Sequence, residues 1–129
     1  MKEPKVYLWD WSEVKDKGAK VENFIASHLL KAVHFWTDQG LGDYSLHYLK
    51  DKEKREVDFL VAKDGEPWFL VEVKTSDESL SKSLFYYQKE KRAPHAFQLV
   101  FDMDYEEGNC FSFSEPVVVP VKTFLSQLI

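Results

Sequence analysis

The chain has little of what small secreted or membrane-bound domains depend on. Its 129 residues include one cysteine, Cys110, so no disulfide can form within the chain. No apolar run approaches the roughly 18 consecutive residues that a membrane-spanning helix needs. The apolar stretch near Met1 is too short for the core of a signal peptide. We therefore expect a cytoplasmic protein with no membrane segment.

Glycine and proline are also scarce, with five residues each, and neither gathers into a linker or a low-complexity stretch. No GxxxxGK[ST] motif is present, so nothing in the sequence indicates nucleotide hydrolysis at a P-loop. Positive charge is in deficit, because the formal net charge is −5, and this argues against a surface that is basic throughout. Residues 50–92 nevertheless hold ten Lys or Arg and ten Asp or Glu, which leaves a local basic face open there.

Apolar and aromatic side chains are abundant, at 44% and 16% of the residues. This content is enough to bury a core, and 129 residues fit one domain that spans residues 1–129. Apolar residues from Ala19 to Trp36 recur every three or four positions. The recurrence predicts an amphipathic helix that ends at Gly40.

Short branched and aromatic runs predict strands at Lys5–Trp9, Tyr44–Lys50, Glu56–Ala62, Trp68–Thr75 and Ala96–Phe101. A second helix is expected at Lys82–Arg92, an extended segment at Phe111–Val119 and a terminal helix from Pro120 to Ile129. Val57–Val61 and Phe69–Val73 are apolar on both faces, which is typical of strands covered on both sides. We therefore expect an α/β fold with a mixed central sheet flanked by helices, in the order helix, three strands, helix, strand.

Three polar residues interrupt the two most apolar strands. Asp58 lies in the first of them, and Glu72 and Lys74 lie in the second. Because an unpaired carboxylate inside a sheet is costly, each of these side chains needs a partner. Glu72 and Lys74 are two positions apart and therefore share one face of the sheet.

The hairpin loop decides whether Asp58 shares that face, since only a loop with an odd number of residues brings the two carboxylates to the same side. The sequence Lys63-Asp64-Gly65 is typical of a three-residue loop that ends with glycine in the left-handed region. Such a loop pairs Ala62 with Glu66 and Asp58 with Leu70. We therefore expect both carboxylates and the lysine on one face.

Two neighbouring carboxylates repel each other, and a hard divalent cation relieves that repulsion. Mg²⁺ or Mn²⁺ suits oxygen ligands, and Mg²⁺ usually takes about one or two carboxylates together with waters and phosphate oxygens. We expect Asp58, Glu72 and the backbone carbonyl of Val73 to bind the metal ion, with Lys74 orienting a water or offsetting charge on a phosphate. The alternative is a purely structural ion bridge between Lys74 and one carboxylate.

The arrangement resembles the PD-(D/E)XK nuclease superfamily, whose D…ExK signature is matched by Val57-Asp58 and Val71-Glu72-Val73-Lys74. Glu22 matches the helix glutamate of that superfamily, and Gln88 matches a glutamine on the helix that follows ExK. The resemblance implies a restriction-endonuclease-like core and catalytic roles for all five residues, Asp58, Glu72, Lys74, Glu22 and Gln88. Glu22 would bind a second metal ion or its waters, and Gln88 would position a ligand or the lysine. Val57 replaces the proline that names the superfamily.

More closely, the chain resembles the C-terminal nuclease-like domain of archaeal-type AAA ATPases, with the ATPase part absent. The resemblance is carried by Lys5-Val6-Tyr7-Leu8, Val21-Glu22-Asn23-Phe24, Arg55-Glu56-Val57-Asp58-Phe59 and Ala96-Phe97-Gln98-Leu99-Val100. It implies a divalent-metal-dependent nuclease that acts on nucleic acid. The alternative is a catalytically inactive interaction or dimerisation module.

Simpler interpretations stay open for several of these residues. Glu22 as a first-turn glutamate would stabilise the positive end of its helix, and Gln88 would be a helix-surface amide. The aromatic residues Trp9 and Trp11 predict an exposed apolar patch that closes in a homodimer, or that a protein partner covers in place of the ATPase part.

Overall fold

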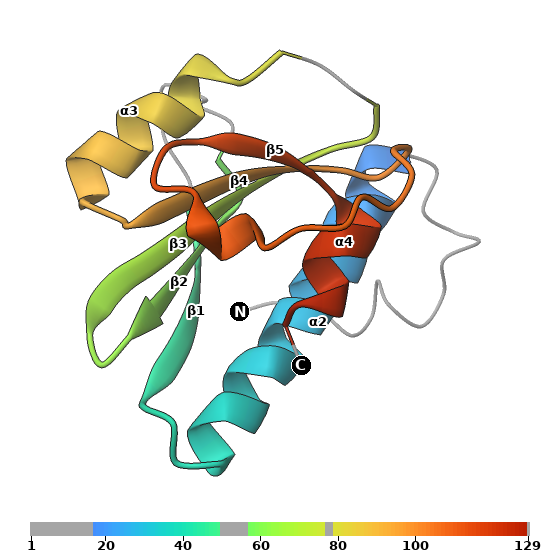
Figure 1. Cartoon of the computed structure of the whole chain (residues 1–129). Helices are drawn as coiled ribbons and strands as arrows, with labels where there is room; N and C mark the ends of the chain where they lie inside the picture. Colours follow the sequence, from blue (N-terminus) through green and yellow to red (C-terminus); the bar gives the residue numbers. More distant parts are fainter. Residues whose placement is uncertain (1–16, 50–56, 77–78, 129) are drawn as a thin grey trace.

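The computed structural model describes residues 17–49, 57–76 and 79–128 (Figure 1). In these residues the elements follow the order α2 (Lys17–Asp38), β1 (Tyr44–Tyr48), β2 (Phe59–Lys63), β3 (Glu66–Lys74), α3 (Lys82–Lys91), β4 (His95–Val100), η2 (Cys110–Ser112), β5 (Val117–Pro120) and α4 (Val121–Ser126). The predicted order of helix, three strands, helix and strand is confirmed. The expected strand Lys5–Trp9 and the expected dimer residues Trp9 and Trp11 lie outside the described residues.

The strands form a mixed sheet in the order β1-β2-β3-β4-β5, counted over the residues that the structure describes. The first three strands are antiparallel neighbours, and β4 and β5 run parallel to β3 and β4. Parallel neighbours need a crossover connection, which α3 provides between β3 and β4. The α/β class and the mixed central sheet were predicted correctly.

Helices cover both faces of this sheet, as Figure 1 shows. The larger core lies between the sheet and the pair α2 and α4, and includes Ile25, Leu29, Phe69, Phe97 and Phe124, all fully buried. The smaller core lies under α3 and joins its Leu84 and Tyr87 to Leu60, Leu70 and Ala96 of the sheet. None of the helices in the described residues combines the length and the apolar character that crossing a bilayer requires.

α2 begins two residues before Ala19 and ends at Asp38, shortly before the predicted end at Gly40. Its buried apolar residues, such as Ile25 and Leu29, belong to the larger core, and Gly40 follows it with φ of +78°, a conformation that glycine adopts without strain. The indole Nε1 of Trp36 donates to the carbonyl of Leu128 over 3.0 Å. This hydrogen bond connects the end of α2 to the end of the described chain.

The hairpin between β2 and β3 differs from the prediction. Its turn has two residues, Asp64 and Gly65, both with positive φ (54° and 82°), as in the hairpin turns that Asp-Gly favours. Lys63 therefore pairs with Glu66, and the expected pairing of Ala62 with Glu66 is wrong. The three-residue loop fails because both turn residues accept the left-handed region. Asp64 also accepts a hydrogen bond from the amide of residue 43 through its Oδ1 at 2.8 Å.

A β-bulge then restores the register that the short turn would lose. Ala62 pairs with Pro67 but Val61 pairs with Phe69, so Trp68 has no partner on β2. Pro67 lacks an amide proton, and proline in a sheet is confined to edges and bulges. As in other bulges, consecutive side chains contact the same core: Trp68 packs against the larger core in which Phe69 is buried. The bulge adds the odd residue that the loop lacks.

The segment before β5 is also less extended than predicted for Phe111–Val119. Asn109 accepts from the amide of Phe111 and starts the short helix η2, and only Val117–Pro120 forms a strand. Pro120 ends β5 and is the N-cap of α4, which confirms the predicted start of the terminal helix.

Candidate functional site

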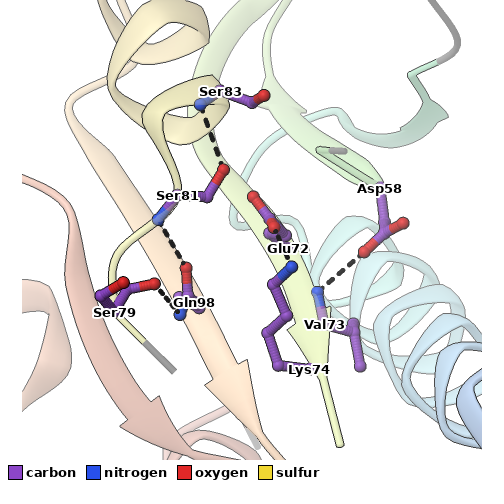
Figure 2. Close-up of polar contacts among 8 residues, drawn as sticks. All are labelled: Asp58, Glu72, Val73, Lys74, Ser79, Ser81, Ser83 and Gln98. Atoms are coloured by element: carbon purple, nitrogen blue, oxygen red, sulfur yellow. Dashed lines mark hydrogen bonds and ion pairs between the residues drawn. The ribbon is translucent and has the colours of Figure 1, made fainter. Parts of the chain in front are cut away.

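Glu72 and Lys74 lie near the end of β3, on the face that α3 covers, because they continue the alternation from buried Leu70. The Glu72 side chain is 1% exposed and that of Lys74 is 17% exposed. The Lys74 Nζ lies 3.0 Å from Oε2 of Glu72 (Figure 2). The ammonium thus balances a carboxylate charge that could not otherwise be buried cheaply.

Asp58 immediately precedes β2 and is held by both neighbouring strands. Its amide donates to the carbonyl of Val71 over 3.0 Å, and its carbonyl accepts from Leu49 over 3.1 Å. Its carboxylate accepts the amide of Val73 at Oδ2 over 2.7 Å, across the hairpin (Figure 2). A side-chain oxygen therefore takes the place of a ladder carbonyl where the regular pairing of the two strands ends. The expected pairing of Asp58 with Leu70 is wrong, because Leu70 pairs with Leu60.

The pKa of Asp58 depends on the other three charged residues of the predicted set, Glu22, Glu72 and Lys74. The pKa of the Asp58 carboxyl is raised from 3.8 to about 7, mainly by burial and then by the negative charges of Glu22 and Glu72. The Val73 amide and the Lys74 ammonium act in the opposite direction and lower this pKa. Charged residues from α2 and from β3 thus act on the same carboxyl group, that of Asp58.

Glu22 lies on α2, the helix that packs on the opposite face of the sheet from α3. It is the sixth residue of α2, its side chain is exposed, and the first turn of α2 contains no acidic residue. The interpretation of Glu22 as a first-turn glutamate is therefore wrong, because the influence of the helix end fades within one turn. Its charge acts on Asp58 instead.

Gln88 does not join this group. Its side-chain Nε2 donates to the carbonyl of Ala93 over 3.1 Å and to that of Ser114 over 2.6 Å. Both acceptors lie towards the beginning of β4, whereas Glu72 pairs with Gln98 further along that strand. Gln88 lies near the C-terminal end of α3 and connects it to the segment before β5, away from Lys74.

Gln98 is the residue that sequence reasoning missed. It is fully buried on β4, directly beside Glu72 in the parallel register. Its Oε1 accepts from the amide of Ser81 over 2.9 Å, and its Nε2 donates to the carbonyl of Ser79 over 3.2 Å (Figure 2). The signal was present in the sequence, since an amide interrupts the apolar strand that β4 forms, as Asp58 and Glu72 interrupt theirs.

The donor chemistry at this site fits a hard divalent cation held by few protein ligands. Asp58 and Glu72 offer carboxylate oxygens, the ligands that Mg²⁺ and Mn²⁺ prefer. Among the residues that the structure describes, no three His, Cys, Asp or Glu side chains gather closely enough to hold a metal ion by themselves. Mg²⁺ is commonly bound by about one or two carboxylates, with waters and substrate oxygens completing its shell. At Val73 the structure shows the amide in contact with Asp58; the expected role of its carbonyl stays a prediction.

Comparison with known families gives a match that covers most of the chain. The family described as Domain of unknown function (DUF4143) matches residues 17–124. Domains of this family are generally found with AAA ATPases. Searches among curated proteins and among solved structures gave no match. The matched span contains every described element from α2 to the first residues of α4, and the chain belongs to the DUF4143 family.

Proposed function

We propose that the chain is a divalent-metal-dependent nuclease, which hydrolyses phosphodiester bonds in nucleic acid with Mg²⁺ or Mn²⁺. The observation that carries the proposal is the contact of Asp58 with the amide of Val73, the residue between Glu72 and Lys74. The contact joins Asp58 to the middle residue of ExK, 15 positions away in the chain, so the two parts of the D…ExK pattern meet at one end of the sheet. The order of helix, three strands, helix and strand supports a restriction-endonuclease-like core.

The perturbed carboxyl of Asp58 supports this proposal. A pKa raised to about 7 by burial, Glu22 and Glu72 marks a place where negative charge is unfavourable and a cation is favourable. Asp58 and Glu72 would hold the metal ion through their carboxylates, and Glu22, whose charge acts on Asp58, would bind waters of that ion. A divalent cation bound there would polarise a phosphodiester and acidify a water molecule.

Lys74 would have two tasks in such a reaction. Its ammonium already neutralises Glu72, and its partial exposure lets it reach solvent. It would donate to the attacking water or to a phosphate oxygen, where negative charge increases in the transition state. Hydrolysis joins the water oxygen to phosphorus and breaks one P–O bond, and the leaving oxygen takes up a proton.

The test combines calorimetric titration of Mg²⁺ and Mn²⁺ with cleavage of labelled oligonucleotides, on wild type and on Glu72→Gln. Glu66→Gln is the matched control, because Glu66 lies on the same strand at the exposed hairpin end. We expect metal binding and cleavage in wild type and control, and loss of both in Glu72→Gln. Wild-type protein that binds neither cation would exclude the proposed function.

A second candidate function is favoured by the Lys74–Glu72 ion pair, if that pair serves only to stabilise the fold. Lys74 and Glu72 balance each other's charge within a largely buried setting. This would suit a catalytically inactive nuclease-like module that serves as an interaction or dimerisation domain. Indifference of the melting temperature to millimolar Mg²⁺, together with a defined oligomer or bound partner protein, would favour this candidate.

A further inference from the structure

The exposed side of α3 alternates basic and aromatic side chains. Residues three or four positions apart lie on the same side of a helix. This spacing brings four residues of α3 into one stripe: Lys82, Phe85, Tyr86 and Lys89. All four are exposed, with Phe85 at 46% and Tyr86 at 42%. Large aromatic side chains exposed together between cations are unusual for a surface whose only partner is water.

The charge of this helix contrasts with that of the whole chain. α3 and its C-cap Arg92 carry four basic residues and one acidic residue, whereas the whole chain has a formal net charge of −5. The acidic residue, Glu90, accepts a hydrogen bond from the hydroxyl of Tyr86 over 2.7 Å. In the acidic loop after β4, Glu106 contacts Thr123 of α4, which covers the other face of the sheet. α3 is therefore a basic element in an acidic chain.

Helix stability accounts for only part of this pattern. Lys89 and Lys91 lie in the last turn, where cations stabilise the negative end of a helix. Lys82 is the first residue of α3, where the same dipole disfavours a cation. Phe85 also leaves 46% of its surface exposed, so burial accounts for only part of its apolar area. A ligand that needs both positive charge and ring faces accounts for the whole stripe.

The stripe begins beside the candidate site. Ser81, the N-cap of α3, donates its amide to Gln98, and Gln98 is the direct neighbour of Glu72 across β3 and β4 (Figure 2). Neighbouring strands lie about 4.8 Å apart, so the first turn of α3 lies next to the Glu72–Lys74 pair. A strand that follows α3 would lead to these two residues.

We infer that the exposed stripe Lys82, Phe85, Tyr86 and Lys89 of α3 binds a single-stranded segment of nucleic acid and guides its backbone to Lys74. The two lysines contact phosphates, and the ring of Phe85 stacks on a base. Single strands are favoured over duplexes because only unpaired bases expose their faces to an aromatic side chain. The choice of nucleic acid as the ligand rests on the proposed function.

The first experiment measures fluorescence anisotropy of labelled oligothymidylate of about 16 nucleotides, with EDTA present so that cleavage cannot occur. The double variant Lys82→Glu/Lys89→Glu should bind at least about tenfold more weakly than wild type. Loss of two phosphate contacts should also reduce the slope of log K against log salt by about 1.4. The control is Lys31→Glu/Lys122→Glu, which makes the same charge change at exposed lysines of α2 and α4. An equal loss in this control would overturn the inference.

The contribution of the aromatic ring is tested with a second variant and its own control. Phe85→Ala should weaken binding about tenfold. Phe35→Ala, at a residue of α2 with a similar exposure of 43%, should leave binding unchanged. Labelled oligouridylate should bind like oligothymidylate if the strand itself is recognised. Tighter binding of a duplex, or equal competition by polyglutamate, would refute the single-strand assignment.

Two separate measurements distinguish this inference from the proposed function: strand binding in EDTA by the α3 variants, and metal uptake and cleavage with Mg²⁺ by wild type. If the α3 variants bind the oligonucleotide normally while wild type cleaves with Mg²⁺, the nuclease proposal stands and the proposed role of the stripe in binding is wrong. If wild type binds through α3 but takes up no metal ion, the stripe stands and the nuclease proposal is wrong.

Discussion

The carboxylate of Asp58 accepts the backbone amide of Val73 over 2.7 Å, although the two residues lie 15 positions apart on either side of a hairpin. This hydrogen bond lowers the pKa of Asp58, yet burial and the charges of Glu22 and Glu72 outweigh it. A carboxyl group that titrates near pH 7 while it holds two strands together makes stability, pH and cation binding depend on one another.

Stability should fall as pH rises towards neutrality, because of Asp58. With its pKa raised from 3.8 to about 7, the folded state binds this proton more tightly than the unfolded chain does. Its contribution is therefore full below about pH 4 and is lost as pH rises to about 7, at up to about 1.4 kcal/mol per pH unit. Asp58→Asn keeps an oxygen for Val73 but cannot titrate, so it should gain stability over wild type at pH 8 relative to pH 5.

Urea denaturation at both pH values measures this difference in the free energy of unfolding. Asp104→Asn, at an exposed position in the loop after β4, is the control and should follow wild type at both pH values. Parallel pH dependence in wild type and Asp58→Asn would show that the carboxyl titrates normally.

Lys74→Met should destabilise the fold by about 3 kcal/mol, because it leaves the 1% exposed Glu72 carboxylate without the ammonium at 3.0 Å. Adding Glu72→Gln should recover much of this loss, since the double variant has no buried charge at either position. A double-mutant cycle in chemical denaturation measures the coupling. Additive losses in the two single variants would contradict the buried pair, and exposed Lys122→Met serves as the surface control.

Mg²⁺ should raise the melting temperature by several degrees at pH 8 when its concentration is about 100 times the dissociation constant. At pH 5.5 the shift should be much smaller, since the cation must displace the proton of Asp58. Differential scanning fluorimetry with Mg²⁺ and with EDTA at both pH values measures this, with Glu72→Gln as the insensitive control. A shift of equal size at both pH values would remove Asp58 from the ligand set.

Gln98→Leu should cost about 2 kcal/mol, because two backbone groups, the amide of Ser81 and the carbonyl of Ser79, lose their partner. Hydrogen exchange should accelerate in the first turn of α3 more than in α2, since Ser81 caps α3. Gln39→Leu at the exposed end of α2 is the control. Uniform acceleration over both helices would indicate a general loss of stability instead of a released loop.

Much of the fold was predictable because its signals are local. The spacing of apolar residues predicts α2, and the apolar runs predict β2, β3 and β4. Tertiary packing changes only the ends of these elements. Asp58, Glu72 and Lys74 were identifiable because charge inside an apolar strand needs a partner. Gln98 obeys the same rule, because an uncharged amide inside an apolar strand also needs partners.

The misses have a different origin, since they depend on contacts between distant segments. Gln88 was assigned by its order in the chain, but the direction of α3 carries it away from Lys74 towards Ser114. The three-residue loop was assigned from the turn alone. The sequence does not show that Trp68 packs against the α2 side next to Trp36, with ring centroids 5.5 Å apart, and so leaves the ladder.

The two-residue turn and the bulge at Trp68 are register shifts that compensate each other. Either change alone would exchange the residues under α2 with those under α3, and the carboxylate of Glu72 would have to enter the larger apolar core. Deletion of residue Trp68 would therefore change the site at Glu72, although none of the side chains of the site would be altered. A viable sequence change at this hairpin has to alter turn and bulge together, so a three-residue turn is compatible with the site only where the bulge is absent.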